Sequence, residues 1–448
     1  MTAPSGGAGR GSSTRQPVRG ADQQARRVAI VHHQTRPTLA LAAAFTFAAG
    51  VAAVVPHRTG PWLPLHLFLV GGLLTAISGV TQFLAVTWSA APPPPHALVG
   101  TQRVLLVVGV FGLGVGRELG ASPVFLGAAG FAVIASLVLL QVSLVRIRTT
   151  GKLHRFRPAI DGYLIAVSFG LVGCFAGIVM ATHVVADRGD LLRSAHLIIN
   201  VFGLVGLVVA ATLPYMVATQ VRSKMSARAT PRALRSATGL LTAATVLACT
   251  GVLCAWPLVA SLGFGAYAVG IAATVSLCPR IQRRQLRWAG PRLGLVAMGV
   301  IWWAGTTAGL AVTAGQGQGP SDRLLLALII GGYAQILAGS LAYLAPVLRG
   351  GGHVRLTAGF ALTRSPLALA AANAAALGAL TGTAVVMITG IAIWLADTAV
   401  RAGLLITVST ANPLPPAPDP AHPSGIVPLD AVSDSRAPTN QSTGGTNG

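Results

Sequence analysis

The chain has 448 residues, of which 53% are hydrophobic and only 9% are charged, and its mean hydropathy is +0.69. A water-soluble chain of this length needs more charge to cover its surface, so the composition predicts a polytopic membrane protein. The formal net charge of +22 suggests nucleic-acid binding, but the basic residues lie in short segments between apolar ones, as topology signals do. We therefore expect the lipid bilayer as a partner and no nucleic acid.

The two ends of the chain differ from its centre in composition. Residues 1–37 are rich in Gly, Ser, Gln and Arg, and no apolar segment with a small-residue cleavage site follows at the distance of a cleaved signal peptide. We expect them to form a disordered basic cytoplasmic tail. Residues 409–448 are rich in Pro, Ser and Thr and are also expected to be disordered. Residues 38–408 are the predicted transmembrane domain.

Apolar segments of bilayer-spanning length recur through this domain and predict an all-α bundle of about 12 transmembrane helices. The last two are the least distinct, because residues 366–408 form one apolar run that is broken only near Gly382. The predicted spans are 38–56, 62–88, 97–117, 122–145, 161–183, 193–220, 237–256, 258–278, 292–314, 323–348, 366–382 and 384–408.

The loops between these spans differ in charge. Loops on one side carry most of the Lys and Arg residues, as in Arg146–Arg157 and Arg222–Arg235, whereas the alternate loops hold few of them and several acids. Because positively charged loops stay in the cytoplasm, the pattern predicts a multi-pass protein of the cell membrane with a cytoplasmic N-terminus. Twelve spans would also place the C-terminus in the cytoplasm.

The second, sixth and tenth spans show a weak internal rhythm. His66 and His196 are 130 residues apart, and Pro214 and Pro346 are 132 residues apart. Four helices per period give three four-helix repeats in twelve spans. The tenth span carries Gln335 and no histidine, so the third repeat lacks this side chain.

His66 and His196 are the predicted cofactor-binding residues, because a histidine inside a membrane is costly unless it has a partner. Both lie about one turn below the predicted outer surface. Gly71, Gly72 and Gly203 follow them and are expected to leave room between helices for a flat macrocycle such as heme. The alternative is a neutral imidazole that bonds to a carbonyl or hydroxyl of a neighbouring helix.

Two further polar features lie within the spans. Asn200 follows His196 by four residues and shares its helix face, so we expect Asn200 and Gly203 to face protein rather than lipid. Asp397 and Arg401 are also four residues apart. A self-neutralising ion pair is the favoured interpretation of the second pair, and a proton relay is its alternative.

Two stretches resemble the membrane domain that is associated with copper nitrite reductase-like multicopper proteins of high-GC bacteria. More distantly, the layout is similar to NnrS-type proteins and to heme-copper oxidase subunit I. The resemblance implies a heme or metal site, a link to nitrogen-oxide or copper metabolism, and a multicopper or redox protein as partner. The two stretches are His196-x3-Asn200-x2-Gly203-x2-Gly206 ending in Arg222-x-Lys224-Met225, and Gln335-x3-Gly339-x3-Tyr343-Leu-x-Pro346.

The departures from the oxidase pattern limit this resemblance. The tenth span has Leu324, Leu325 and Leu326, or Gln335, where an oxidase needs histidines, and the seventh span has no histidine. We therefore do not expect an enzyme with a binuclear centre. Two functions remain: a heme- or metal-binding membrane module, or a transporter or assembly partner without a cofactor.

Overall fold

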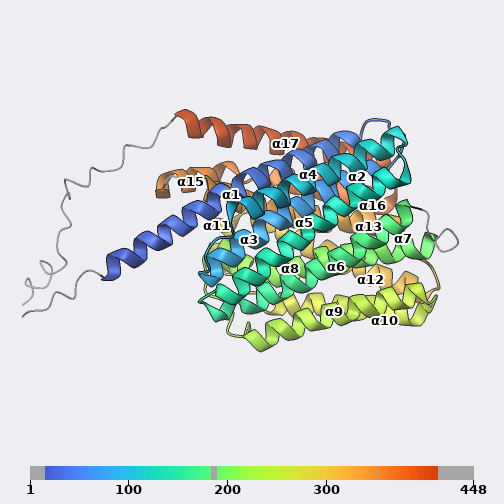
Figure 1. Cartoon of the computed structure of the whole chain (residues 1–448), viewed down its shortest axis with the longest axis horizontal. Coiled ribbons are helices and arrows are strands. Elements are labelled where there is room, and N and C mark those ends of the chain that lie inside the picture. The colour runs from blue at the N-terminus through green and yellow to red at the C-terminus, as the bar shows by residue number, and fades with distance from the viewer. Residues whose placement is uncertain (1–15, 183–188, 351, 412–448) are drawn as a thin grey trace, which may run out of the picture. The chain divides into compact units, whose positions relative to one another are not determined.

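The computed structural model describes residues 16–182, 189–350 and 352–411, and this part of the chain contains helices and no strand. Figure 1 shows long helices lying side by side. Within these described ranges, ten helices are long and apolar enough to cross a bilayer, so the predicted all-α polytopic fold is confirmed. They are Trp62–Ser89, His96–Leu119, Pro123–Thr150, His154–Ala181, Gly189–Gln220, Pro231–Leu253, Pro257–Ser276, Pro291–Gly315, Asp322–Arg349 and Ala384–Thr407.

Three of these spans change from α- to π-helical geometry partway along. Such wide turns are rare and mark positions where a helix departs from regular packing. The three spans are α2 (Trp62–His66), η1 (Leu67–Leu74) and α3 (Thr75–Ser89); α7 (Gly189–Ile198), η4 (Ile199–Gly206) and α8 (Leu207–Gln220); and α13 (Asp322–Ala327), η5 (Leu328–Ala334) and α14 (Gln335–Arg349).

Three of the remaining helices begin at a capping residue. Ser122, Thr230 and Ser365 each precede a proline, and each side-chain oxygen accepts a hydrogen bond from the backbone N–H three residues later. The remaining helices are α1 (Gln16–Ala52), α4 (His96–Leu119), α5 (Pro123–Thr150), η2 (His154–Phe156), α6 (Arg157–Ala181), α9 (Pro231–Leu253), α10 (Pro257–Ser276), α11 (Arg283–Ala289), α12 (Pro291–Gly315), α15 (Gly352–Leu362), α16 (Pro366–Thr381) and α17 (Ala384–Ala411).

The π-helices define three four-helix repeats. They begin at Leu67, Ile199 and Leu328, which are 132 and 129 residues apart. Each packs against the helix that opens its repeat, α1, α6 or α12. A helical hairpin follows each, formed by α4 and α5, by α9 and α10, and by α16 and α17. The predicted repeat is therefore confirmed.

The same packing device occurs in every repeat. One glycine of the π-helix lies against an aromatic ring of the preceding helix, so that a Cβ at that glycine would come within 3 Å of ring carbons. Small residues of this kind allow membrane helices to approach closely. The pairs are Gly71 with Phe45 (2.8 Å), Gly203 with Phe169 (2.7 Å) and Gly331 with Trp302 (2.6 Å).

The second and third repeats meet at η4. The hydroxyl of Tyr267, from α10, donates to the carbonyl of Phe202 at 2.8 Å, and that of Tyr333, from η5, donates to the carbonyl of Val201 at 2.9 Å. Both rings and that of Trp303 are fully buried. A buried tyrosine needs a partner for its hydroxyl, so these two bonds fix α10 and η5 against η4.

The two other predicted spans, 38–56 and 366–382, are also helical. Residues 38–52 belong to α1, which lies along η1 and α3. The 16 residues of α16 extend about 24 Å, which is shorter than a hydrocarbon core of about 30 Å. That these two helices cross the bilayer stays a prediction.

The predicted N-terminal tail needs a correction. Helix α1 begins at Gln16, so residues 16–37 are helical rather than disordered. Val31 is buried, Gln34 Nε2 donates to the Pro94 carbonyl at 2.9 Å, and Arg36 Nε donates to the Leu348 carbonyl at 2.7 Å. These contacts with distant segments stabilise a helix that composition alone does not favour. Residues 1–15 and 412–448 lie outside the described part of the chain.

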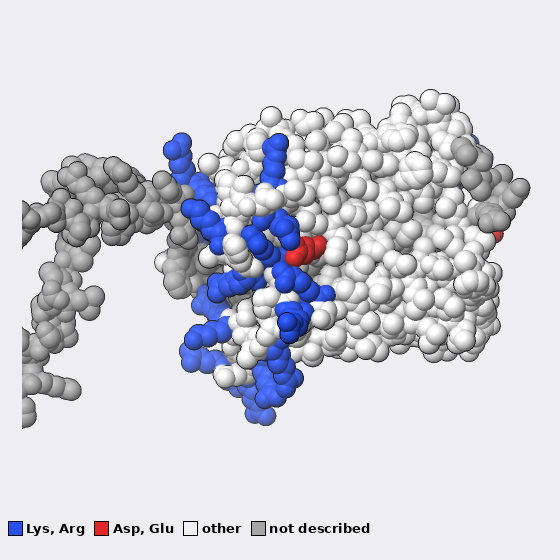
Figure 2. Space-filling view, turned by 60° about the horizontal axis from the view of Figure 1, so that its bottom comes forward, with Lys and Arg blue, Asp and Glu red and all other residues white. Residues whose placement is uncertain are grey.

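Lys and Arg side chains gather at one end of the bundle, which we call the basic end (Figure 2). Four contacts tie its loops together. Arg222 lies 3.8 Å above the ring of Trp288, whose carbonyl accepts a bond from Arg364. Asp161 pairs with Arg148 and Arg235 from two other segments. The charge asymmetry expected from the sequence is present, and the prediction that this end faces the cytoplasm follows from it.

Candidate functional site

His196 lies in α7, where it contacts a glycine face of α6. Its Nδ1 is 2.8 Å from the carbonyl oxygen of Gly173, and a Cβ at Gly177 would lie 3.0 Å from its Cε1. Asn200, one turn later, donates to the His196 carbonyl at 2.9 Å and also packs on Gly173. Both side chains are therefore enclosed by protein, and the predicted orientation of Asn200 and Gly203 is correct.

His66 is the last residue of α2. Its Nδ1 is 2.9 Å from the carbonyl oxygen of Trp62, one turn earlier, and its ring stacks on the Trp62 indole with centroids 4.0 Å apart. The guanidinium of Arg117, near the end of α4, lies 4.8 Å from the same indole. The imidazole is half-buried, and its ring plane is fixed by both the stacking and the hydrogen bond.

These two contacts determine where the imidazole protons lie. A carbonyl oxygen can only accept a hydrogen bond, so these contacts favour a proton on each Nδ1; at His196 the carbonyl contact of 2.8 Å is shorter than the 3.3 Å from Nδ1 to the Asn200 amide nitrogen. In the neutral form, the Nε2 atoms of His66 and His196 then each hold a free lone pair. No hydrogen bond to either Nε2 occurs among the described residues. This is the tautomer in which histidine binds a metal through Nε2 while Nδ1–H is held by a carbonyl.

Helices α2 and α7, which carry the two histidines, are labelled at the same end of the bundle in Figure 1, opposite the end where Lys and Arg gather in Figure 2. In the described part of the chain, no third His, Cys, Asp or Glu joins them in a metal-binding group. The third repeat has Leu325 where the second has His196, counted from the start of the π-helix. The available donor set is thus two imidazoles.

The space expected for a macrocycle is filled. The rings of Phe45 and Phe169 lie against Gly71 and Gly203, and the Thr46 hydroxyl lies against Gly72. The expectation that these glycines leave a gap is therefore wrong. Their absent side chains make room for neighbouring helices. The donor set fits heme iron or a metal ion, but the packing beside it fits an ion better than a porphyrin.

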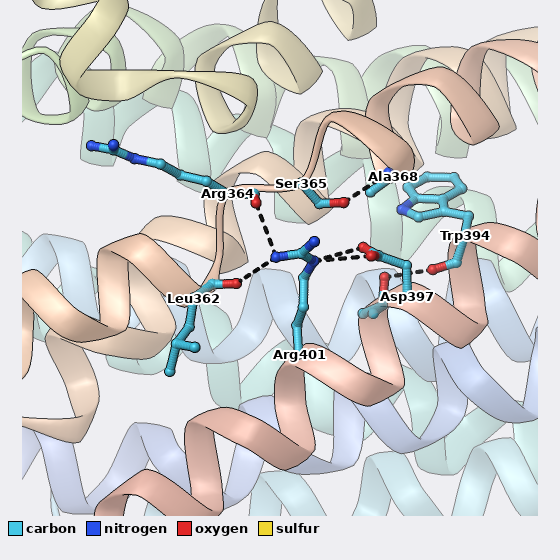
Figure 3. Close-up of polar contacts among 8 residues, drawn as sticks. Leu362, Arg364, Ser365, Ala368, Trp394, Asp397 and Arg401 are labelled. Carbon is cyan, nitrogen blue, oxygen red and sulfur yellow. Dashed lines mark hydrogen bonds and ion pairs between the residues drawn. The ribbon is translucent and has the colours of Figure 1, made fainter.

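Asp397 and Arg401 pair on one face of α17, and Figure 3 shows how Arg401 extends the pair to a neighbouring segment. Arg401 Nε lies 3.0 and 2.9 Å from the two carboxylate oxygens. Its Nη1 donates to the carbonyls of Leu362 and Arg364, both at 2.9 Å. The guanidinium thus fastens α17 to the turn between α15 and α16, which favours the structural interpretation over a proton relay.

The sequence analysis missed a second polar region, which lies between α1, α3 and α4 in the first repeat. Thr75, Ser78 and Gln82 face it from α3, and Gln102 and Arg103 face it from α4. A signal for it exists in the sequence. The three α3 residues are spaced by three and four positions, so they form a polar stripe on one helix face.

Together the fold and the donor set define a class: a multi-pass helical membrane protein of three four-helix repeats, with a histidine pair at one end. No protein-family model matches this sequence, and a comparison with curated proteins finds no similar chain. The similarity to the copper nitrite reductase-associated membrane domain and to NnrS-type proteins therefore stays a prediction from the two sequence stretches.

Proposed function

We propose that this membrane protein binds a transition-metal ion or a heme iron through Nε2 of His66 and His196, and that it serves nitrogen-oxide or copper metabolism. The observation that carries the proposal is the pair of Nδ1–carbonyl bonds, at 2.9 and 2.8 Å. They hold each imidazole in one tautomer with its second nitrogen free. Imidazole nitrogen suits copper, iron, zinc and nickel.

The packing at the glycines favours a single ion over a macrocycle. An ion between two imidazoles needs no gap at Gly71 or Gly203, whereas a porphyrin there requires Phe45 and Phe169 to move. The bonds that His66 and His196 donate from Nδ1 to the Trp62 and Gly173 carbonyls hold the two imidazoles in place and increase the basicity of Nε2. A multicopper or redox partner would approach the end that carries the histidines.

The test replaces histidine by asparagine. In His196→Asn the amide nitrogen occupies about the place of Nδ1 and keeps the bond to Gly173, but the second nitrogen is lost. We expect purified wild-type protein, expressed with added copper or hemin, to hold the metal or to show a heme absorbance band. His66→Asn and His196→Asn should lose it without a change in melting temperature, and His154→Asn, at the basic end, should keep it.

A colourless, metal-free wild-type protein under both conditions overturns the proposal. The histidines are then packing residues, and the function is transport or assembly without a cofactor. Loss of metal in the His154 variant as well would show adventitious surface binding instead.

A further inference from the structure

A small polar cavity lies inside the first repeat, away from the histidine pair. It has a volume of about 20 Å³ and is lined by α1, α3 and α4. A single water occupies about 10–15 Å³ on this measure, so the cavity holds one small ligand. Gln82 and Gln102 lie about 10 Å along their helices from Ser89 and His96, so the cavity is within the bilayer region.

Five polar atoms at this cavity are buried and have no hydrogen-bond partner among the described residues. Thr75, Ser78, Gln82 and Gln102 are only 1%, 3%, 5% and 2% exposed, so water does not reach them from outside. A buried polar group without a partner is costly, and five around one space indicate a ligand. The atoms are Thr75 Oγ1, Ser78 Oγ, Gln82 Oε1, Gln102 Nε2 and Arg103 Nη1.

The hydrogen bonds around the cavity determine which of its lining atoms are donors and which are acceptors. Gln82 Nε2 donates to the Ser78 carbonyl and to Gln102 Oε1, both at 2.9 Å. If the Gln82 amide were flipped, its oxygen would lie against the carbonyl oxygen of Ser78. These hydrogen bonds therefore determine the orientation of the amide. Gln102 Oε1 is then an acceptor, and its Nε2 is left as a free donor that faces the cavity.

Among these five atoms, groups that can donate therefore outnumber acceptors; α1 adds the side chains of Gln34, Thr35 and Thr38 to the lining, and each of these already donates to a backbone carbonyl. Gln102 Nε2 and Arg103 Nη1 can only donate, and the Thr75 and Ser78 hydroxyls can turn to donate. The lining includes no carboxylate, and Arg103 forms no ion pair with any described residue. Gln82 Oε1 is the one atom of the five that can only accept. A positive charge with amide and hydroxyl donors is the chemistry that binds an anion.

The α3 side of the cavity leads toward the basic end. The Ser89 carbonyl, at the end of α3, accepts a bond from the backbone N–H of Leu153 in the basic loop between α5 and α6, and Arg27 donates to the Ala90 carbonyl beside it. The positive potential of the basic end raises the local concentration of anions next to the cavity. We propose that the cavity between α1, α3 and α4 binds one inorganic anion of halide size, loaded from the basic end.

The test is equilibrium binding of radiolabelled chloride to the purified full chain. Wild-type protein should bind chloride saturably, about one per chain, and bromide but not gluconate should displace it. Gln102→Leu and Arg103→Gln should each weaken binding about tenfold or more, because each removes a buried donor. Arg146→Gln is the matched control, since it removes an exposed charge at the basic end that does not line the cavity.

Three results would overturn the proposal. Wild-type protein that binds no chloride shows that the cavity holds buried water only. An equal loss in the Arg146 variant shows general attraction to the basic end rather than a site. Full binding by folded Gln102 and Arg103 variants places the anion elsewhere. The wild-type measurement stands even if a variant does not fold.

Discussion

The first two repeats and the third share a scaffold but differ in chemistry. All three place a π-helix glycine against an aromatic ring of the preceding helix. Histidines stand before η1 and η4, whereas Leu325 and Ala327 stand before η5. The third repeat instead contributes Tyr333 to the packing around η4. Helix packing is therefore what the repeats have in common, and single side chains added to it make the candidate sites.

The largest expected effect tests the shared scaffold. In Gly203→Leu the new side chain collides with the Phe169 ring, which α6 and η4 hold in place. Overpacking of this kind costs about 1–3 kcal/mol. Gly71→Leu and Gly331→Leu should cost about as much in the other two repeats, since each glycine faces an aromatic ring.

The measurement is the melting temperature in detergent, with Gly239→Leu as control. Gly239 is exposed on α9 and nothing lies within 4 Å of its missing Cβ. A control as unstable as the three variants would show that glycine flexibility matters rather than the close contact with the aromatic rings.

The next effect concerns the ion pair that is specific to the third repeat. Asp397→Asn keeps the shape of the side chain but removes the charge that faces Arg401, whose side chain is 30% exposed. We expect a loss of about 1–2 kcal/mol, below that of a fully buried pair. Asp322→Asn removes a similar charge from the exposed pair with Arg193, and should change stability by about 0.5 kcal/mol or less. Equal effects would reject the anchoring role of Arg401.

A smaller effect tests the contact between the third repeat and η4. Tyr333→Phe removes the donor to the Val201 carbonyl and should cost about 0.6 kcal/mol, the average for such bonds between membrane helices. Tyr215→Phe is the matched control, because its buried hydroxyl has no partner among the described residues. Urea or detergent unfolding of both variants should show a loss for Tyr333 alone. Equal loss in both would mean that the hydroxyl bond does not hold the repeats together.

Sequence patterns predicted the fold class, the four-helix repeat and the end of the bundle where charge collects, because these depend on hydropathy and on loop composition. They did not predict that residues 16–37 are helical, since that helix depends on contacts such as Arg36 with Leu348, more than 300 residues away. The role of the glycines was misjudged for the same reason. A glycine in a membrane helix indicates that another group packs closely against it, but the sequence does not say which group. Here the rings of Phe45 and Phe169 fill these positions.

The candidate site was predictable only in part. A histidine inside a span is easily noticed in a sequence, so His66 and His196 were identified as candidates. The carbonyl partners on Trp62 and Gly173 have no side-chain signature and required coordinates. The polar cavity of the first repeat was overlooked because amides and hydroxyls are common in membrane helices, and only their convergence from α3 and α4 makes them notable.

The smallest expected effect lies in the loop that joins α1 to α2, near the histidine end. Both ring nitrogens of His57 face carbonyl oxygens, that of Val55 at 2.7 Å and that of Gly60. Two acceptors require two donors, so the loop favours the protonated ring. The bond to the Val55 carbonyl, followed by that to Gly60 and by the charge of Glu118, raises the pKa of His57 above its ordinary value.

A raised pKa in the folded state means that His57 stabilises the loop fully below its unfolded pKa of about 6.5, and that this contribution is lost as the pH rises through the higher folded value. Hydrogen exchange of the peptide covering residues 53–61 measures this locally. The wild-type loop should be more protected than that of His57→Gln at pH 5.5, and the two should converge by pH 8.5 after correction for intrinsic exchange. Because His57 is only partly buried, we expect a small difference. A difference that stays constant over this range would mean that the shape of the ring, rather than its charge, holds the loop.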